Sequence, residues 1–283
     1  MSVPEHRQMI DKLDARIVRL LNERTRHVLA IGDIKLKAGE EIYAPHRERA
    51  VFERVSRFNR GPMTNEQLRA VYREIMSSAL ALEKTMTIAY FGREGSGTHQ
   101  AALRKFGASL EYSRQKTIAD VFREVGKKRA DYGVVPVDHF AEGIITHTLD
   151  LFVDSDLKIV SEIMSPAPRS FAGIQDNTAK AGRFLVLGRQ GSPPTGDDRT
   201  SLLVGVTDEA GALRDVTAVF RRCKINLTQI ESRPGRRKAR EYFFFIDCEG
   251  HAQDRDVARA IQLLGKHSHF VKVLGSYPNT DWA

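Results

Sequence analysis

Apolar and charged positions alternate along the first 85 residues with the period of an α-helix. Across residues 5–37 apolar side chains recur three or four positions apart, which predicts one long amphipathic helix. Its apolar positions are Ile10, Leu13, Ile17, Leu20, Leu21, Val28 and Ile31. Such a helix is roughly 48 Å long, so two shorter helices of the same chain cannot cover it. The uncovered apolar stripe predicts a dimer.

Two shorter helices are predicted to follow. Pro45 suits a first helical turn and opens a helix that reaches about residue 59, where Arg60-Gly61-Pro62 interrupts it. Thr64 and Gln67 form a capping-box pattern that opens a third helix, which ends near residue 84. The three helices make up a predicted first domain, residues 1–85.

From residue 86 the pattern becomes one of short apolar strands separated by amphipathic helices. The predicted strands are 87–91, 109–112, 132–137 and 157–160, and the predicted helices are 98–106, 118–128 and 142–151. This alternation predicts an α/β layer with a largely parallel sheet. After a linker, one isolated strand at 183–188 is placed to return to that sheet. The predicted second domain covers residues 86–190.

A linker rich in glycine, proline and serine, residues 190–198, leads into a third pattern. The order of elements is βαββαβ, at 202–206, 210–223, 225–230, 242–247, 254–265 and 270–274. That order is typical of the ferredoxin-like fold. The chain is therefore predicted to be multidomain, α and α/β, with its third domain at residues 199–283.

Composition narrows the classes of function. The net charge of +8 is spread along the chain, and its densest run, residues 233–240, includes a predicted hairpin tip. We therefore expect solvated faces and one cationic pocket for a small polyanion, and no nucleic-acid partner. Two cysteines are too few for a disulfide framework and are predicted to be reduced and buried. With no predicted signal peptide, membrane span or metal-ligand spacing, a cytoplasmic protein without a metal is expected.

The cations of the first helix suggest where that pocket lies. Arg24 and Lys35 are eleven positions apart and return to nearly the same helix face. Arg7 and Arg24 are seventeen positions apart, which separates them by roughly 100° around the helix and about 25 Å along it. One pocket cannot easily use Arg7 and Arg24 of the same helix, whereas a dimer in which each helix serves two pockets can.

These positions resemble the all-helical, intertwined chorismate mutases. The matching positions are Arg7, Asp14, 20–24, Ile31, Gly32, Lys35, Pro45, Arg47, Glu48, 73–77, Leu82 and Glu83. Residues 86–163 resemble the first lobe of prephenate dehydratase, and residues 200–278 resemble an ACT domain. The three-part order is that of the bifunctional chorismate mutase–prephenate dehydratase family.

The resemblance implies that the first domain rearranges chorismate to prephenate with no cofactor. Arg24 and Arg47 would clamp the two carboxylates, with Arg7 supplied by the other protomer of a homodimer. Lys35 would donate to the ether oxygen, and Glu48 would accept the substrate hydroxyl. These residue types suit the chemistry, because guanidinium forks bind carboxylates bidentately and a preorganised donor stabilises developing charge.

Glu83 would complete the ether-oxygen site, which requires its carboxyl group to be protonated. The family has glutamine or glutamate there. The chain departs from the best-known pattern at Ala44, where an acidic residue is expected, and at Ala79, where a serine is expected and Ser78 lies beside it. These departures put fine substrate contacts in question and leave the pocket itself in place.

The dehydratase motifs are altered. The loop 92–98 and the stretch Asp138-His139-Phe140 differ from the family motifs, and Gly182 replaces the catalytic threonine of Thr-Arg-Phe. The family places a whole second lobe before that threonine, and only residues 165–183 stand there in this chain. We therefore predict a pseudo-dehydratase with no prephenate dehydratase activity.

Two motifs of the third domain match the family. Gly211-Ala212-Leu213 and Glu231-Ser232-Arg233-Pro234 resemble the motifs by which ACT domains of this family bind phenylalanine at a dimer interface. Phenylalanine is therefore the expected effector, and dimers or dimers of dimers are the expected assembly. The sequence leaves two alternatives open: a non-catalytic phenylalanine sensor for a partner enzyme, and a lyase of the same fold acting on isochorismate.

Overall fold

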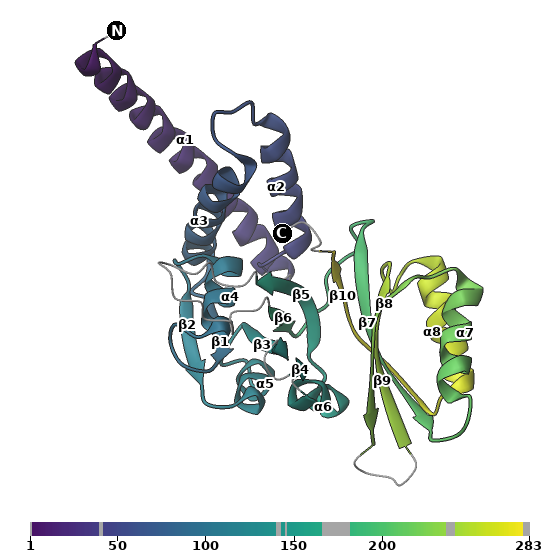
Figure 1. Cartoon of the computed structure of the whole chain (residues 1–283). Helices are drawn as coiled ribbons and strands as arrows, with labels where there is room; N and C mark the ends of the chain where they lie inside the picture. The colour runs from purple at the N-terminus through teal and green to yellow at the C-terminus, as the bar shows by residue number, and fades with distance from the viewer. Residues whose placement is uncertain are drawn as a thin grey trace, which may run out of the picture. The chain divides into compact units, whose positions relative to one another are not determined.

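The computed structural model describes residues 2–39, 42–139, 143–144, 146–165, 182–235 and 241–279 (Figure 1). Much of the predicted linker (166–181) and hairpin tip (236–240) lies outside these residues. The chain divides into two compact units. The first consists of Met1–Tyr43, Arg54–Met86 and Phe106–Glu111, and the second of Ala44–Glu53, Thr87–Lys105 and Tyr112–Ala283.

Capping residues set the ends of the first helices. Helix α1, Val3–Ala38, follows Ser2, whose backbone N–H donates to the Glu5 carboxylate at 2.6 Å. It ends at Gly39, where a φ of 71° closes the helix in the left-handed region. Helix α3, Asn65–Glu83, opens with the predicted capping box, in which Thr64 and Gln67 exchange hydrogen bonds of 2.9 and 3.2 Å. With α2, Pro45–Phe58, the three predicted helices are confirmed.

Helix α1 leaves its apolar stripe exposed. Among its described residues only Gly32 is buried. The exposed large apolar side chains of α1 are Val3, Met9, Ile10, Leu13, Ile17, Val18, Leu20, Leu29, Ile31, Ile34 and Leu36. An exposed apolar face of this extent is typical of a surface that contacts a partner.

Most of the second unit's first half is an α/β lobe. Its elements are β1 (Thr87–Phe91), α4 (Gly97–Phe106), β2 (Glu111–Gln115), α5 (Ile118–Gly126), β3 (Tyr132–His139), β4 (Gly143–Ile144), α6 (Thr146–Asp154), β5 (Lys158–Ser165) and β6 (Gly182–Gly188). The main strand order is β2-β1-β3-β6-β5, with β4 paired to β3. Strands β1 and β3 are parallel, and β6 lies antiparallel between β3 and β5. The isolated strand does complete the sheet.

Two expectations for this lobe need correction. A largely parallel sheet was predicted, but the sheet is mixed, because β6 pairs antiparallel with both β3 and β5. The helix predicted at 142–151 starts later, at Thr146, because Gly143–Ile144 pairs with the end of β3 instead.

The rest of the unit has the predicted βαββαβ order. Its elements are β7 (Asp198–Thr207), α7 (Ala212–Cys223), β8 (Leu227–Pro234), β9 (Glu241–Glu249), α8 (Arg255–His267) and β10 (Phe270–Pro278). The sheet is antiparallel in the order β10-β7-β9-β8, with α7 and α8 on one face (Figure 1). Cys223 of α7 and Cys248 of β9 are buried and free in the core between the helices and the sheet, as predicted. Burial raises the pKa of the Cys248 thiol to about 12, which makes it inert at neutral pH.

The other face of this sheet shares one hydrophobic core with the α/β lobe. Phe245, Leu274 and Tyr277 of the ferredoxin-like sheet pack in the same cluster as Phe152 and Ile159 of the lobe. Strand β10 runs directly against β5. A Cβ at Gly275 would lie 2.0 Å from the Ile159 carbonyl oxygen, so only glycine permits this approach.

We expect Gly275→Ala to lower the free energy of unfolding by about 3 kcal/mol, because backbone on both sides prevents relief of the overlap. The matched control is Gly265→Ala in α8, where an added Cβ meets nothing within 4 Å. There we expect a gain of about 0.5 kcal/mol from reduced chain entropy. Urea denaturation of both variants measures the difference, and equal stabilities would show that β5 and β10 are not in close contact.

Candidate functional site

The first unit gathers three predicted site residues where α1 passes α3. Arg24 and Lys35 of α1 both act electrostatically on Glu83, the last residue of α3. The Lys35 ammonium donates to the Ile42 carbonyl at 3.0 Å, which holds its side chain over the turn after α1. Arg24 Nη1 is buried and has no hydrogen-bond partner among the described residues. A buried guanidinium nitrogen of this kind is suited to an anionic ligand.

Gly32 brings the two helices together at this point. A Cβ added to Gly32 would lie 2.7 Å from Glu83 Oε2 and 3.0 Å from its Cγ, so the missing side chain makes room for the carboxyl group. Gly32 matches the chorismate mutase pattern, but no role in the site was predicted for it. The available signal was a glycine in the interior of a helix, where it costs stability and usually has a packing or functional reason.

The environment of Glu83 raises the pKa of its carboxyl group. Burial is the largest cause, and the positive charges of Lys35 and Arg24 oppose it only in part. At a given pH, Glu83 is therefore protonated to a greater extent than an ordinary glutamate. A protonated carboxyl group is a hydrogen-bond donor, as the predicted role at an ether oxygen requires.

We expect mutase activity to fall as pH rises through the raised pKa of Glu83, because deprotonation replaces a donor with a negative charge. Glu83→Gln should flatten that limb, since an amide donates at every pH. The measurement is kcat for chorismate between pH 4 and pH 9, for the wild type and for Glu83→Gln. A range of roughly this width includes pH values below and above a raised carboxyl pKa. Identical profiles for the two would show that Glu83 does not control the reaction.

Arg7 lies at the other end of the predicted site. It is exposed in the first turns of α1, seventeen residues and about 25 Å along the helix from Arg24. Within one chain, Arg7 and the Arg24–Lys35–Glu83 cluster are therefore apart. The predicted joint use of Arg7 and Arg24 requires a second protomer.

Arg47 and Glu48 lie in the first turn of α2 and belong to the second unit. Arg47 is exposed. Glu48 is largely buried, and its Oε2 pairs with Lys105 Nζ of α4 at 2.8 Å. Ala44 accepts the backbone N–H groups of both Arg47 and Glu48 and so starts the helix.

Of the two uncertain positions on α3, only one shares a face with Glu83. Ala79 is buried and lies four residues before Glu83, on nearly the same side of the helix. Ser78 lies about 140° away around the helix, is exposed, and its hydroxyl donates to the Ile75 carbonyl at 3.1 Å.

The two motifs of the ferredoxin-like domain lie on different elements, one at the start of α7 and the other in β8. Gly211, with a φ of 97°, caps α7, and Ala212 and Leu213 open that helix. In β8, Glu231 and Arg233 pair across the strand with Phe245 and Phe243. Strand partners point to the same side, so these two motif residues face the α/β lobe. By alternation, Ser232 and Pro234 lie on the helix side, exposed.

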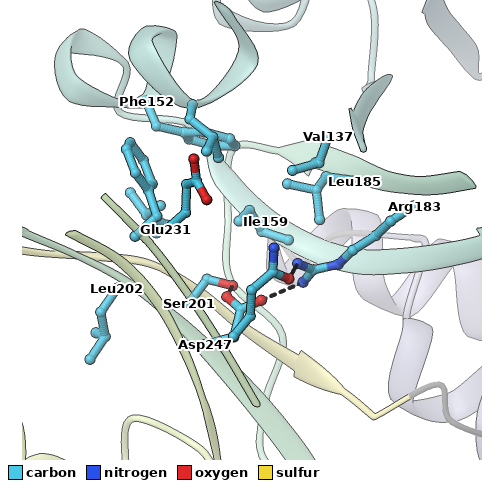
Figure 2. Close-up of a pocket in the computed structure, with 13 residues that line it drawn as sticks. Val137, Phe152, Ile159, Arg183, Leu185, Ser201, Leu202, Glu231 and Asp247 are labelled. Carbon is cyan, nitrogen blue, oxygen red and sulfur yellow. Dashed lines mark hydrogen bonds and ion pairs between the residues drawn. The ribbon is translucent and has the colours of Figure 1, made fainter. Parts of the chain in front are cut away.

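Glu231 lines a small pocket between the α/β lobe and this sheet, whose polar wall is an ion network (Figure 2). Arg183 of β6 pairs with Glu162 of β5 at 2.9 Å and with Asp247 of β9 at 2.6 Å, while Arg199 of β7 pairs with Glu162 at 2.7 Å. Burial lowers the pKa of Arg183, but Asp247, Tyr277 and Glu162 raise it more, so the guanidinium stays charged. The network joins the lobe to the sheet.

The remaining described positions of the dehydratase motifs form a turn or pack in the interior. Gly92 and Gly95 both have positive φ in the loop before α4, and the Gly95 N–H donates to His99 Nδ1 at 3.0 Å. Phe184 is buried beside Gly97. Asp138 and His139 belong to β3, but their side chains and all of Phe140 lie outside the described residues.

Within the described part of the chain, no helix is long and apolar enough to cross a membrane. The same residues contain no cluster of three or more side chains able to hold a metal ion.

Family comparisons agree with this organisation. Residues 6–84 match chorismate mutase type II, residues 88–178 match prephenate dehydratase, and residues 200–263 match the ACT domain. Fold and sequence together define a three-part protein with a helical chorismate mutase domain, a dehydratase-like α/β lobe and an ACT domain.

Whole-chain relatives identify the family. The chain is 39% identical over 351 aligned positions to the bifunctional chorismate mutase/prephenate dehydratase of Aquifex aeolicus, covering 97% of each protein. It is 33% identical over 349 positions to the enzyme of the same name from Neisseria gonorrhoeae, covering 96% of each. The chain belongs to the bifunctional chorismate mutase/prephenate dehydratase family. Because it has 283 residues, at least 68 of the 351 positions hold residues of the Aquifex protein only.

Solved structures of prephenate dehydratases match about two thirds of the chain. Prephenate dehydratase of Streptococcus mutans is 32% identical with a TM-score of 0.56, over 68% of this chain and 98% of that one. The Arthrobacter aurescens prephenate dehydratase in complex with L-Phe shares the fold, with 23% identity and a TM-score of 0.61, over 70% of this chain and 92% of that one.

Proposed function

We propose that the protein is a chorismate mutase that converts chorismate to prephenate without a cofactor. The observation that carries the proposal is the cluster of Arg24, Lys35 and Glu83, with one guanidinium nitrogen unpartnered and the carboxyl pKa raised. An intramolecular rearrangement needs no nucleophile; it needs a cationic pocket that holds a compact dicarboxylate and donates to the ether oxygen. In this proposal Arg24 and Arg47 hold the carboxylates, and Lys35 and Glu83 donate to the ether oxygen.

The complete pocket requires a homodimer. Arg7 is supplied by the partner protomer, and Glu48 accepts the substrate hydroxyl. The exposed apolar stripe of α1 supports this assembly, because an isolated chain would leave it in water. Ala79 faces the pocket beside Glu83, and Ser78 has no direct role.

We further propose that the dehydratase is inactive. Three observations support this. The Aquifex relative has at least 68 positions that this chain lacks, and Gly182 has no hydroxyl group to replace that of the catalytic threonine. Arg183, which follows it in the same motif, forms ion pairs with Glu162 and Asp247. In the dehydratase family the site lies between two lobes. A single lobe offers no such cleft.

The ACT domain is proposed to bind phenylalanine. Gly211 permits close backbone approach at the start of α7, and Ser232 and Pro234 are exposed on the helix side of β8. A second copy of the domain would complete the ligand site. We propose domain limits of 1–85, 86–190 and 199–283, with the second and third domains packed as one body.

The direct test is turnover of chorismate and, separately, isochorismate by the purified protein, with and without phenylalanine. The proposal expects chorismate loss with prephenate formation and little reaction of isochorismate. Faster cleavage of isochorismate would identify a lyase. No turnover of either, together with a phenylalanine-dependent rise in melting temperature, would identify a non-catalytic sensor.

A further inference from the structure

The last full turn of α4, in the α/β lobe, places a lysine against a proposed mutase residue. Lys105 Nζ lies 2.8 Å from Glu48 Oε2, and only 16% and 13% of the two side chains are exposed. Both residues belong to the second unit. Pairs on an open surface hold their geometry weakly, whereas this one is largely screened from solvent.

Phe106, Ala108 and Ser109, which follow Lys105, each contact another residue of the first unit. The Phe106 ring lies 5.0 Å from the ring of Tyr43, and the Ala108 N–H donates to Glu74 Oε2 at 3.0 Å. The Ser109 N–H donates to Ser77 Oγ at 3.1 Å. These contacts hold residues 106–109 within the first unit.

Gly107 makes this anchoring possible. Its φ of 75° lies in the left-handed region, and a Cβ there would be 2.5 Å from the Cβ of Ser77. A side chain would therefore be strained by its own backbone and would also collide with α3. The segment is built to lie against the mutase helix.

We propose that Lys105 is a positioning residue for the mutase reaction and acts through Glu48. The inference rests on the proposed function, in which Glu48 accepts the substrate hydroxyl. A glutamate side chain has three rotatable bonds, and an opposed ammonium holds it in one arrangement. An ionised carboxylate has about four acceptor sites, so pairing with Lys105 is compatible with a hydrogen bond from substrate. The α/β lobe thereby contributes to mutase catalysis without any chemistry of its own.

The experiment compares kcat and KM for chorismate in the full-length protein and its variants. Lys105→Met keeps side-chain length and removes the charge, and Lys105→Arg keeps the charge. Arg104→Met is the matched control, because Arg104 is the preceding, exposed cation on the same turn. We expect Lys105→Met to lower kcat/KM by about 10- to 100-fold, the effect expected from a misplaced contact, with Lys105→Arg partly restored. Arg104→Met should stay within about twofold of wild type, as expected for an exposed charge.

A double variant separates positioning from general stability. If Lys105 acts through Glu48, adding Lys105→Met to Glu48→Gln should cause almost no further loss. Full multiplication of the two losses would overturn the inference, and so would an unchanged kcat/KM in Lys105→Met. If Lys105→Met fails to fold, the same comparison is made with Lys105→Arg, whose smaller loss of kcat/KM should also disappear when Glu48→Gln is already present. An inactive wild type would instead refute the proposed function.

Discussion

Replacing Lys35 by alanine should lower kcat for chorismate by about 100- to 1,000-fold, the usual effect of removing one preorganised donor to a developing oxyanion. Lys35 is held by its hydrogen bond to the Ile42 carbonyl and lies near Glu83, so its ammonium is already in place before substrate arrives. The matched control is Lys37→Ala, because Lys37 is exposed and lies about 160° away around the same helix. Similar losses in the two variants would point to general charge attraction in place of a positioned donor.

A mixing experiment shows whether the pocket is shared. Arg7→Ala and Lys35→Ala homodimers should each be inactive, since every pocket lacks one group. After denaturation and refolding as an equal mixture, about half of the dimers are mixed, and each of these has one intact pocket. About a quarter of wild-type activity should return. No recovery, with mixed dimers present, would contradict the assignment of Arg7 to the partner's pocket.

Replacing Arg183 by methionine should lower the free energy of unfolding by about 3–5 kcal/mol, because it leaves buried Asp247 without its cation and buried Glu162 with Arg199 alone. Glu162 is 1% exposed and Asp247 is 8% exposed, so water cannot replace the guanidinium. The control is Arg214→Met, which removes an exposed pair with Asp215 and should cost less than about 1 kcal/mol. Urea denaturation measures both. A loss below about 1 kcal/mol for Arg183→Met would mean that the network is not formed in solution.

The Arg183 network gives the α/β lobe a structural role that does not depend on catalysis. The ACT sheet has helices on one face only, and its other face carries Phe245, Leu274 and Tyr277. The lobe covers that face with its own core and satisfies Asp247 through Arg183. Loss of the lobe would expose this apolar face and leave the charge unpaired.

Local signals in the sequence were sufficient for much of the fold. The capping box at Thr64 and Gln67, the opening of α2 at Pro45 and the βαββαβ order all depend on residues close in the chain, and the structure has them. The return of residues 183–188 to the first sheet also followed from an apolar strand with no other partner. Helical spacing placed Arg24 and Lys35 on one face of α1.

Features that depend on distant pairing were not predictable. Two examples are the ion pairs Glu48–Lys105 and Arg183–Asp247, whose partners lie on different helices or sheets. Such pairs form only when those elements pack, and the periodicity of the sequence carries no information on them. The sequence gives no reason for a glycine at position 32, whereas the structure shows that the Glu83 carboxyl group of α3 occupies the space beside it. Strand β6 runs antiparallel to both of its neighbours, β3 and β5, and the strand's own residues do not specify that direction.

We propose a chorismate mutase whose dehydratase lobe does not catalyse. The most direct measurement supplies purified protein with chorismate at neutral pH and follows prephenate and phenylpyruvate together. The account predicts that prephenate accumulates in proportion to the chorismate lost, while phenylpyruvate forms no faster than from prephenate without protein. Phenylpyruvate formation above that background, in proportion to protein concentration, would contradict it.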